Sequence, residues 1–313
     1  MADIVIAEFM DEASVRALAA RADTLYEPDL VDQPQALRAA LADCRALIVR
    51  NRTMVNNELL AAGPALKLVG RLGVGLDNID LPACAARHIA VYPATGANDD
   101  AVAEYVACCA MMLLRGAYGA QQDMIAGQWP RARLMGHEIA GKHAGLIGFG
   151  GTARKAATRL AALGMIVCAT DPALPADHPA WQSVERVTLE RLLIKCDVIS
   201  LHVPLIAATN HMINAATLAL VQPHAVLINA ARGGIVDEAA LISALKAKAL
   251  AGAALDVFEE EPLKQGGAQF AGIPNLILTP HIAGVTIESN VRVSALIADI
   301  RQVKSQVHVP VST

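Results

Sequence analysis

The chain has 313 residues and a formal net charge of −4, from 26 basic and 30 acidic side chains. This length corresponds to about two domains, and the near-balance of charge gives no support to a nucleic-acid surface or a polybasic membrane arm. Hydrophobic residues make up 54% of the chain and charged residues 18%, a composition that excludes a disordered chain.

The mean hydropathy of +0.40 raises the question of a membrane span. The longest stretch without Asp, Glu, Lys or Arg lies between Asp197 and Arg232, and prolines and amides interrupt it. It therefore predicts strands and turns rather than one apolar helix. The N-terminus lacks a basic signal-peptide start. The six cysteines form no CxxC pair, and no histidine cluster has zinc spacing. We expect a cytoplasmic protein with reduced thiols and no metal site.

Short aliphatic runs alternate with alanine-rich amphipathic stretches in the first hundred residues, which predicts a parallel sheet covered by helices. The expected strands are Ile4–Ala7, Ala46–Val49, Leu66–Gly70 and Ala90–Tyr92. The expected helices are Asp11–Ala22, Pro34–Ala42 and Asn56–Ala61.

A long helix is expected over Asp99–Leu114, since two aspartates favour its N-terminal dipole. A second alternating series follows and predicts a doubly wound nucleotide-binding domain. Its expected strands are Ala144–Gly148, Met165–Thr170, Val198–Leu201, Ala225–Asn229, Ala251–Leu255 and Leu276–Thr279. A final helix is expected over Thr286–Ser305.

The first of these strands leads into Gly148-Phe-Gly150-Gly-Thr-Ala153, with a helix expected over Arg154–Leu163. The first glycine permits a tight turn, the second lets the backbone approach a pyrophosphate, and the third position needs a small residue. An acid about 20 residues on can bind the ribose 2′-hydroxyl. Asp171 occupies that place and no arginine follows it, so we expect NAD rather than NADP.

Three polar motifs follow later strands: one from Asn229 to Asp237, one from Asp256 to Pro262, and one from Thr279 to Gly284. The carboxyl ends of strands in an open α/β sheet line the ligand crevice. Histidine can exchange a hydroxyl proton near neutral pH, a neighbouring carboxylate orients it, and arginine binds a carboxylate in two bonds. We expect His281, Glu261 and Arg232 in these roles.

The whole set of motifs resembles the D-isomer-specific 2-hydroxyacid dehydrogenase family over essentially the full chain. The matching segments are Gly148–Ala153, His202–Pro204, Asn229–Asp237, Asp256–Pro262 and Pro280–Gly284. The resemblance implies that Arg232 binds the substrate carboxylate, that His281 is the acid/base and that Glu261 is its partner. It also implies that Asp256 holds the nicotinamide amide. The expected NAD-site residues are Gly148, Phe149, Gly150, Gly151, Thr152, Ala153, Asp171, His202, Pro204, Thr209, Ala230, Asp256 and Gly284.

The family's fold implies two doubly wound parallel-sheet domains. A Rossmann NAD-binding domain, residues 99–284, is inserted into a flavodoxin-like substrate domain, residues 1–98 completed by 285–313. Members of the family are usually dimers, so a homodimer is expected. Ala153 replaces the usual third glycine and Thr152 the usual aliphatic residue, and both changes are compatible with the family.

A group of cations in the substrate domain and before the NAD fold suits a second anion on the substrate. Similar positions in 3-phosphoglycerate dehydrogenases contact the distal phosphate, although solvated charges or dimer contacts are the alternative. The expected substrate-site residues are Arg50, Asn51, Arg52, Arg71, Val74, Gly75, Asn98 and Arg131.

Several local segments, among them Trp129–Arg131 and Leu134–Glu138, are similar to bacterial sulfolactate dehydrogenases within this family. The expected substrate is therefore of the 3-sulfolactate or 3-phosphoglycerate type. A general hydroxypyruvate/glyoxylate reductase is one alternative, and a nucleotide-sensing binding protein on the same fold is another. Formate dehydrogenases of this fold carry glutamine as the histidine's partner, so Glu261 argues against them.

Overall fold

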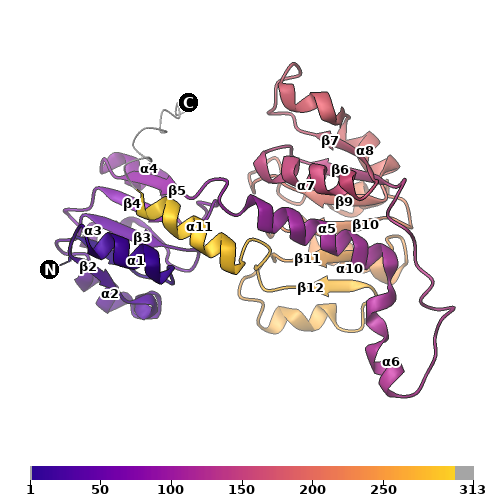
Figure 1. Ribbon diagram of the computed structural model, residues 1–313, viewed down its shortest axis with the longest axis horizontal. Coiled ribbons are helices and arrows are strands. Elements are labelled where there is room, and N and C mark those ends of the chain that lie inside the picture. Colours follow the sequence, from indigo (N-terminus) through magenta and orange to yellow (C-terminus); the bar gives the residue numbers. More distant parts are fainter. Residues whose placement is uncertain (1, 300–313) are drawn as a thin grey trace. The chain divides into compact units, whose positions relative to one another are not determined.

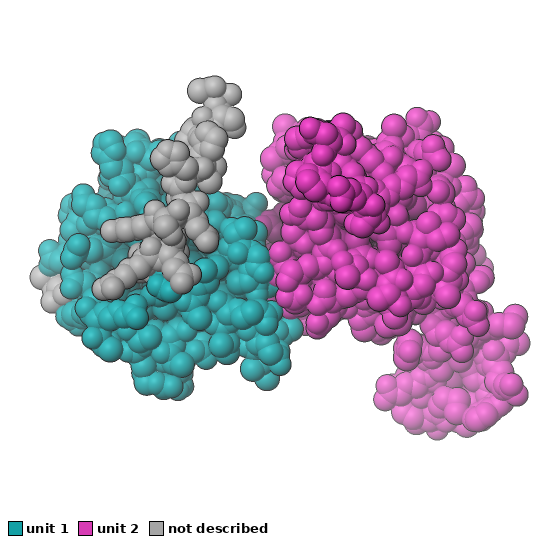
Figure 2. All heavy atoms as spheres, turned by 45° about the horizontal axis from the view of Figure 1, so that its top comes forward, with its two compact units in different colours: residues 1–98, 285–313 teal, residues 99–284 magenta. Residues whose placement is uncertain are grey.

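The computed structural model describes residues 2–299, which fall into two compact units (Figures 1 and 2). Of the described residues, those up to Asn98 and those from Val285 onward form unit 1, and Asp99–Gly284 form unit 2. Each unit is an α/β structure built on one parallel sheet, as the sequence predicts.

Unit 1 contains a five-stranded sheet in the order β2-β1-β3-β4-β5, all parallel. This is the flavodoxin-like order. The strands are β1 (Ile4–Ile6), β2 (Thr24–Tyr26), β3 (Ala46–Val49), β4 (Leu68–Arg71) and β5 (Ala90–Pro93). The helices are α1 (Glu12–Ala19), α2 (Pro34–Ala40), α3 (Asn57–Ala62), α4 (Leu81–Ala86) and α11 (Ile287–Ala298), with a 3₁₀ turn at Pro28–Asp32.

Separate apolar clusters cover the two faces of this sheet. Buried side chains of α2, α3 and α4 pack on one face, and those of α1 and α11 on the other. A Cβ on Gly70 of β4 would lie 2.8 Å from Ile297 of α11, so the strand and the helix need a glycine there to approach. The final helix thereby completes the core that the first hundred residues begin.

Unit 2 contains a seven-stranded parallel sheet in the order β12-β11-β10-β9-β6-β7-β8. Numbered within the unit this is 7-6-5-4-1-2-3, the Rossmann order with one added strand. The strands are β6 (His143–Ile147), β7 (Ile166–Thr170), β8 (Glu185–Arg186), β9 (Val198–Leu201), β10 (Val226–Asn229), β11 (Gly252–Leu255) and β12 (Leu276–Leu278).

Helices cover both faces of the larger sheet. The core on one side includes α5 (Asp99–Arg115) and α7 (Gly151–Ala162). The core on the other includes α8 (Leu189–Lys195), α9 (Ala215–Leu218) and α10 (Glu238–Lys246). The remaining helical segments are α6 (Gln121–Ile125) and 3₁₀ turns at Ala117–Ala120, Pro179–Ser183 and Gln265–Phe270.

The structure corrects several predicted element boundaries. The second sheet has seven strands rather than six, because the two-residue edge strand β8 was not predicted. Helix α7 begins at Gly151 rather than Arg154. The short β2 and α4 were also not predicted. Helix α11 ends at Ala298, and the predicted helical residues 300–305 lie outside the described part of the chain.

Within residues 2–299 no single helix is long and apolar enough to cross a membrane. Helix α5 passes a test of length and composition only together with the bent segment Ala117–Ile125 that follows it.

Candidate active site

The turn between β6 and α7 has the backbone that a dinucleotide site requires. Gly148 has φ +89°, and a Cβ on it would lie 2.7 Å from the carbonyl oxygen of His202. Both the positive φ and the lack of space for a side chain therefore require a glycine at this position. A Cβ on Gly150, which precedes the first turn of α7, would meet nothing within 4 Å. The space beside Gly150 is therefore open, which is compatible with the pyrophosphate site that the motif predicts.

Asp171 follows β7 and closes this turn from the neighbouring strand. Its carboxylate accepts the N–H of Phe149 at 2.8 Å, and its other oxygen accepts the N–H groups of Ala173 and Leu174 at 2.9 and 3.2 Å. Phe149 is buried and stacks on Trp181 with ring centroids 5.0 Å apart. These hydrogen bonds fix the orientation of the Asp171 carboxylate at the carboxyl end of β7.

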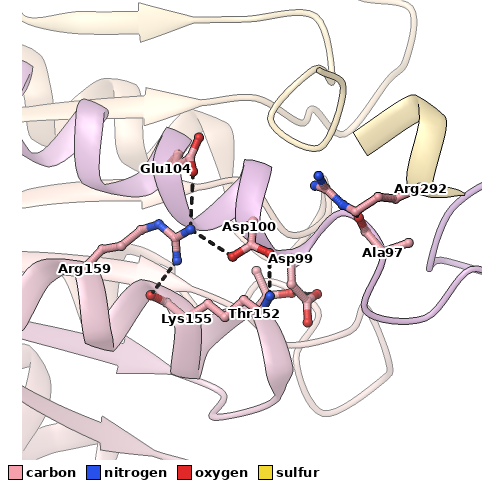
Figure 3. A network of polar contacts seen from close by, with 8 residues as sticks. All are labelled: Ala97, Asp99, Asp100, Glu104, Thr152, Lys155, Arg159 and Arg292. Atoms are coloured by element: carbon pink, nitrogen blue, oxygen red, sulfur yellow. Dashed lines mark hydrogen bonds and ion pairs between the residues drawn. The ribbon is translucent and has the colours of Figure 1, made fainter. Parts of the chain in front are cut away.

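Polar contacts join the start of α5 to the start of α7 (Figure 3). The Thr152 hydroxyl donates to the buried carboxylate of Asp99 at 2.6 Å, which gives the unusual threonine of the glycine turn a clear contact. Farther along α7, Lys155 and Arg159 both donate to Asp100 and lower the pKa of that carboxyl.

A separate contact lies in unit 1, where the Arg292 side chain donates to the carbonyl oxygen of Ala97 at 2.9 Å (Figure 3).

The segment after β9 carries His202, Pro204 and Thr209. Burial lowers the pKa of His202 to about 4, so its ring is neutral at pH 7, and it shares a hydrogen bond of 3.0 Å with Ser200. The Thr209 hydroxyl donates to the carbonyl of Pro204 at 2.6 Å and accepts the N–H of Ile206 at 2.9 Å. These bonds fix a tight loop at the carboxyl edge of the sheet.

Arg232 lies on the loop after β10, which the buried Asn229 shapes. The Asn229 side chain donates to the carbonyl of Arg232 at 2.9 Å and accepts the N–H of Ala231 at 3.1 Å, so the backbone of Ala230 is enclosed by this turn. A Cβ on Gly233 would lie 1.7 Å from the carbonyl oxygen of Phe258. Glycine is therefore required for the Arg232 loop to approach the loop that carries Glu261.

Glu261 and His281 form a direct pair. Nδ1 of His281 lies 2.6 Å from Oε2 of Glu261, and the other oxygen of Glu261 accepts the N–H of Phe258 at 3.1 Å. Because Nδ1 is engaged by the carboxylate, Nε2 is the nitrogen left for a substrate. The peptide bond before Pro262 is cis.

The pKa of Glu261 reflects its neighbours. Burial alone would raise it, but the hydrogen bond and charge of His281, the N–H of Phe258 and the charge of Arg232 together hold the pKa below its usual value. A carboxyl group with a lowered pKa stabilises the folded state at neutral pH and loses that contribution as the pH falls through its folded-state pKa. Because the charges of His281 and Arg232 both act on Glu261, these three side chains of unit 2 form one electrostatic site.

Asp256, at the end of β11, is fully buried. Both of its carboxylate oxygens accept hydrogen bonds from the segment that carries His281. Gly284, the last residue of that segment, is half-buried. The family resemblance implies only a role toward the cofactor for Asp256, and no sequence pattern predicts that it lies under the loop of His281.

In unit 1 a buried glutamate orders the segment after β3 that carries Arg50 and Arg52. The Glu8 carboxylate accepts the N–H groups of Arg50, Arg52 and Thr53 at 2.8, 3.3 and 3.0 Å. The Arg50 guanidinium donates to Asn290 at 2.8 Å and lies 5.7 Å from the ring centre of Phe9. Burial lowers the pKa of Arg50 despite the charge of Glu8. A charged residue directly after a buried strand was the available sequence signal for Glu8.

The other predicted substrate residues have varied surroundings. Arg52 forms an ion pair with Asp32, and both side chains are exposed. The guanidinium of Arg71 lies over Gly73, whose φ is +153°. Asn51 and Val74 are exposed, and Gly75 and Asn98 are half-buried. Arg131 is exposed, and within residues 2–299 no hydrogen bond or ion pair joins its side chain to the three residues of the Arg232 site.

Comparisons with known proteins agree with this geometry. Residues 107–283 match the family model described as the D-isomer specific 2-hydroxyacid dehydrogenase, NAD binding domain. The chain is 54% identical to an (S)-sulfolactate dehydrogenase of Chromohalobacter salexigens, over 96% of this chain and 97% of that protein. It is 34% identical to a D-3-phosphoglycerate dehydrogenase of Synechocystis over 99% of this chain and 56% of that enzyme. The chain thus spans about half the length of the phosphoglycerate dehydrogenases it matches.

Solved structures give the same class. A D-lactate dehydrogenase of Aquifex aeolicus, complexed with NAD and lactic acid, superposes with a TM-score of 0.85 at 26% identity, over 96% of this chain and 95% of that one. A glyoxylate reductase of Paecilomyes thermophila superposes with a TM-score of 0.84 at 27% identity, over 97% and 95%.

The fold and the site define a nucleotide-dependent oxidoreductase. The chain belongs to the D-isomer-specific 2-hydroxyacid dehydrogenase family, and its reaction is the NAD-dependent interconversion of a 2-hydroxy acid and its 2-oxo acid.

The Glu261 charge predicts a pH effect. Glu261→Gln keeps the shape of the side chain but removes the negative charge that favours the imidazolium form of His281. In the direction of 2-oxo acid reduction, the alkaline fall of kcat/KM should move to lower pH by about one unit. Initial-rate pH profiles measure this shift, with Glu260→Gln, an exposed neighbour, as the matched control. Superimposable profiles of Glu261→Gln and wild type would contradict the role given to the charge.

Proposed function

We propose that the chain interconverts a sulfolactate-type 2-hydroxy acid and its 2-oxo acid, 3-sulfopyruvate being the preferred substrate for reduction. The observation that carries this proposal is the 54% identity with an (S)-sulfolactate dehydrogenase across nearly the full length of both chains. The D-3-phosphoglycerate dehydrogenases named above match this chain over only about half of their own length. Their substrate class makes 3-phosphohydroxypyruvate the second candidate.

The stereochemical label of that relative agrees with a D-isomer-specific family. R and S are assigned from the priority order of the substituents on C2. In D-lactate the carboxylate has higher priority than the methyl group, and the configuration is R. A CH₂SO₃⁻ group has higher priority than the carboxylate, because sulfur has priority over oxygen. The same spatial arrangement around C2 therefore receives the label S.

The geometry supports the following proposed roles of the residues in reduction. Bound NADH supplies the hydride, and the balanced reaction consumes one proton with each 2-oxo acid. Arg232 binds the C1 carboxylate and polarises the adjacent carbonyl. His281 transfers its Nε2 proton to the ketone oxygen, and Glu261 stabilises the imidazolium before transfer. In the oxidative direction the same nitrogen accepts the hydroxyl proton.

The residues proposed to hold NAD are those of the glycine turn, Asp171 and the loop of Pro204 and Thr209. The open space beside Gly150 and the clash that a side chain on Gly148 would make support this assignment. Asp171 supports NAD over NADP, because a carboxylate at that place repels a 2′-phosphate. Asp256 is proposed to accept from the nicotinamide amide with its remaining acceptor capacity.

The second anion is proposed to bind the cations after β3 and β4 of unit 1. Arg50 is the strongest candidate, because Glu8 orders its backbone and Asn290 and Phe9 orient its guanidinium. Arg71 is the second candidate. Arg52 is weaker, since its side chain already pairs with Asp32. Among the described residues, 2–299, the Arg131 side chain makes no hydrogen bond or ion pair that supports a substrate role over a surface one.

A homodimer is also proposed, formed through the exposed arm of unit 2, residues 117–138. Figure 1 shows α6 and the following loop extending away from the sheet of this unit. Ile125, Trp129 and Met135 are 71%, 72% and 85% exposed, and such a cluster of large apolar side chains marks an interaction site. A second copy of the chain would cover this arm in a two-fold arrangement.

We also propose a cytoplasmic location. All six cysteines are free thiols, which supports this location.

The substrate proposal predicts a preference that depends on Arg50. With NADH, kcat/KM should be highest for 3-sulfopyruvate among 3-sulfopyruvate, 3-phosphohydroxypyruvate, hydroxypyruvate, glyoxylate and pyruvate. Arg50→Gln should lower kcat/KM for 3-sulfopyruvate by about 10- to 100-fold, the scale of a lost charge-assisted bond, and leave pyruvate reduction nearly unchanged. Arg16→Gln, which breaks an exposed ion pair on α1, is the control.

Each other outcome of this assay has a definite meaning. Highest activity with pyruvate or glyoxylate would replace the sulfolactate proposal by a general 2-oxoacid reductase. NADH binding without turnover of any acid would favour the nucleotide-sensing alternative.

The proposed role of the arm, residues 117–138, predicts that substitutions on it will disrupt the dimer. Ile125→Asp combined with Trp129→Asp should convert a dimer into a monomer, because two charges would have to be buried in an apolar contact. Light scattering coupled to size-exclusion chromatography measures the mass. Ile166→Asp, on an apolar residue that is 50% exposed elsewhere in unit 2, should remain dimeric. A wild-type monomer, or a dimer that survives both arm substitutions, would contradict the proposal.

A further inference from the structure

The loop that carries His281 is fastened to one buried side chain. Oδ1 of Asp256 accepts the N–H of Ile282 and Oδ2 accepts the N–H of Ala283, both at 2.8 Å. The carbonyl oxygen of Asp256 accepts the N–H of His281 itself, also at 2.8 Å. Three consecutive amides of the catalytic segment therefore donate to a single residue.

These bonds hold His281 in a backbone conformation that its side chain disfavours. His281 has φ +55°, in the left-handed region that residues other than glycine rarely adopt. That conformation places the imidazole ring 2.6 Å from Glu261. A shift of Asp256 would release the loop toward a more common conformation and move the ring away from its partner.

Asp256 is in turn held by a chain of two hydroxyl groups. The Thr279 hydroxyl lies 2.6 Å from Oδ1 of Asp256 and 2.6 Å from the Tyr105 hydroxyl. An ionised carboxylate accepts but does not donate, so the single proton of Thr279 is directed to Asp256. Tyr105 must then be the donor to Thr279.

Tyr105 is a permanent donor in this position. It lies in the middle of α5, half-buried, and burial raises the pKa of its phenol well above the usual value even though the bond to Thr279 acts the other way. Helix α5 is anchored along its length by the buried apolar face that it packs on the larger sheet. The hydroxyl of Tyr105 is therefore fixed by a rigid element rather than by a loop.

We propose that Tyr105 is a positioning residue of the reaction, acting through Thr279 and Asp256 on the backbone of His281. The chain of contacts runs from helix α5 through the end of β12 to the end of β11 and then to the catalytic loop. It lies wholly within unit 2. The proposal rests on the acid/base role given to His281, and it adds a residue that no local motif of the active site contains.

The test is a double-mutant cycle measured with the 2-oxo acid that the wild-type enzyme reduces fastest. Tyr105→Phe removes one hydroxyl and keeps the ring, and it should lower kcat by about 5- to 50-fold, since small displacements of a catalytic group reduce the rate steeply. Thr279→Val should have an effect of similar size, and Thr279→Ser, which keeps the hydroxyl, should stay near wild type. In the Thr279→Val background, Tyr105→Phe should have no further effect on kcat.

Two readouts separate positioning from simple stabilisation. Tyr26→Phe is the matched control, because the half-buried Tyr26 hydroxyl in unit 1 bonds both the N–H and the carbonyl of Met10. It should lower Tm about as much as Tyr105→Phe but leave kcat unchanged. Tyr105→Phe should also shift the alkaline limb of the kcat/KM pH profile in the same direction as Glu261→Gln, because a displaced imidazole loses the carboxylate.

The proposal is overturned if Tyr105→Phe keeps the wild-type kcat and pH profile, or if its effect adds fully to that of Thr279→Val. A wild-type enzyme that reduces no 2-oxo acid would instead refute the function on which the proposal rests. The two failures are therefore distinguishable in the same set of assays.

Discussion

All strands of the larger sheet run in one direction, and this constraint places every chemically important group of unit 2 along one edge. The glycine turn follows β6, Asp171 follows β7, His202 follows β9, Arg232 follows β10, and Asp256 follows β11. Helix α7 begins at the same edge and presents its free amides there. A parallel sheet with both faces covered leaves its carboxyl edge as the place where polar side chains can meet a ligand.

Close backbone approaches turn this shared edge into a site. Gly148 brings the first turn against the backbone of His202, and Gly233 brings the arginine loop against the backbone of Phe258. Neither approach tolerates a Cβ. The second one lets the charge of Arg232 act on Glu261, whose carboxylate binds the imidazole of His281. The electrostatics of the pair formed by Glu261 and His281 therefore depend on a glycine that takes no part in it.

Much of this arrangement could be predicted from the sequence. The Gly148 turn and the motifs around Arg232, Glu261 and His281 each follow an aliphatic run, and strand alternation alone indicates that they share an edge. Aliphatic runs also locate β3 and β9, and the charges at its two ends locate α5, within a residue or two. Short edge elements such as β8 escaped prediction, because two residues carry no periodicity. Helix α7 begins earlier than predicted because Gly151 and Thr152 are poor helix formers whose place is set by tertiary contacts, among them the bond from Thr152 to Asp99.

The supporting groups were harder to predict, because nothing local in the sequence joins them to the site. Glu8 orders the Arg50 loop from another strand, and the path from Tyr105 through Thr279 to Asp256 connects residues far apart in the chain. The first contact depends on the pairing of β1 with β3, and the second on how α5 packs on the larger sheet, neither of which a sequence pattern specifies. The sequence predicts the residues proposed to react, whereas the residues that support them emerge only from packing.

The central claim is that Arg232 and His281 act on the two ends of one 2-oxo acid group. The most direct measurement is a crystal structure of the enzyme with NADH and oxamate, an unreactive analogue of a 2-oxo acid. The account predicts that the oxamate carboxylate pairs with the Arg232 guanidinium and that its carbonyl oxygen accepts a hydrogen bond from Nε2 of His281, with Nδ1 still on Glu261. Oxamate bound with its carbonyl oxygen away from His281, or a His281 ring that has left Glu261, would contradict it.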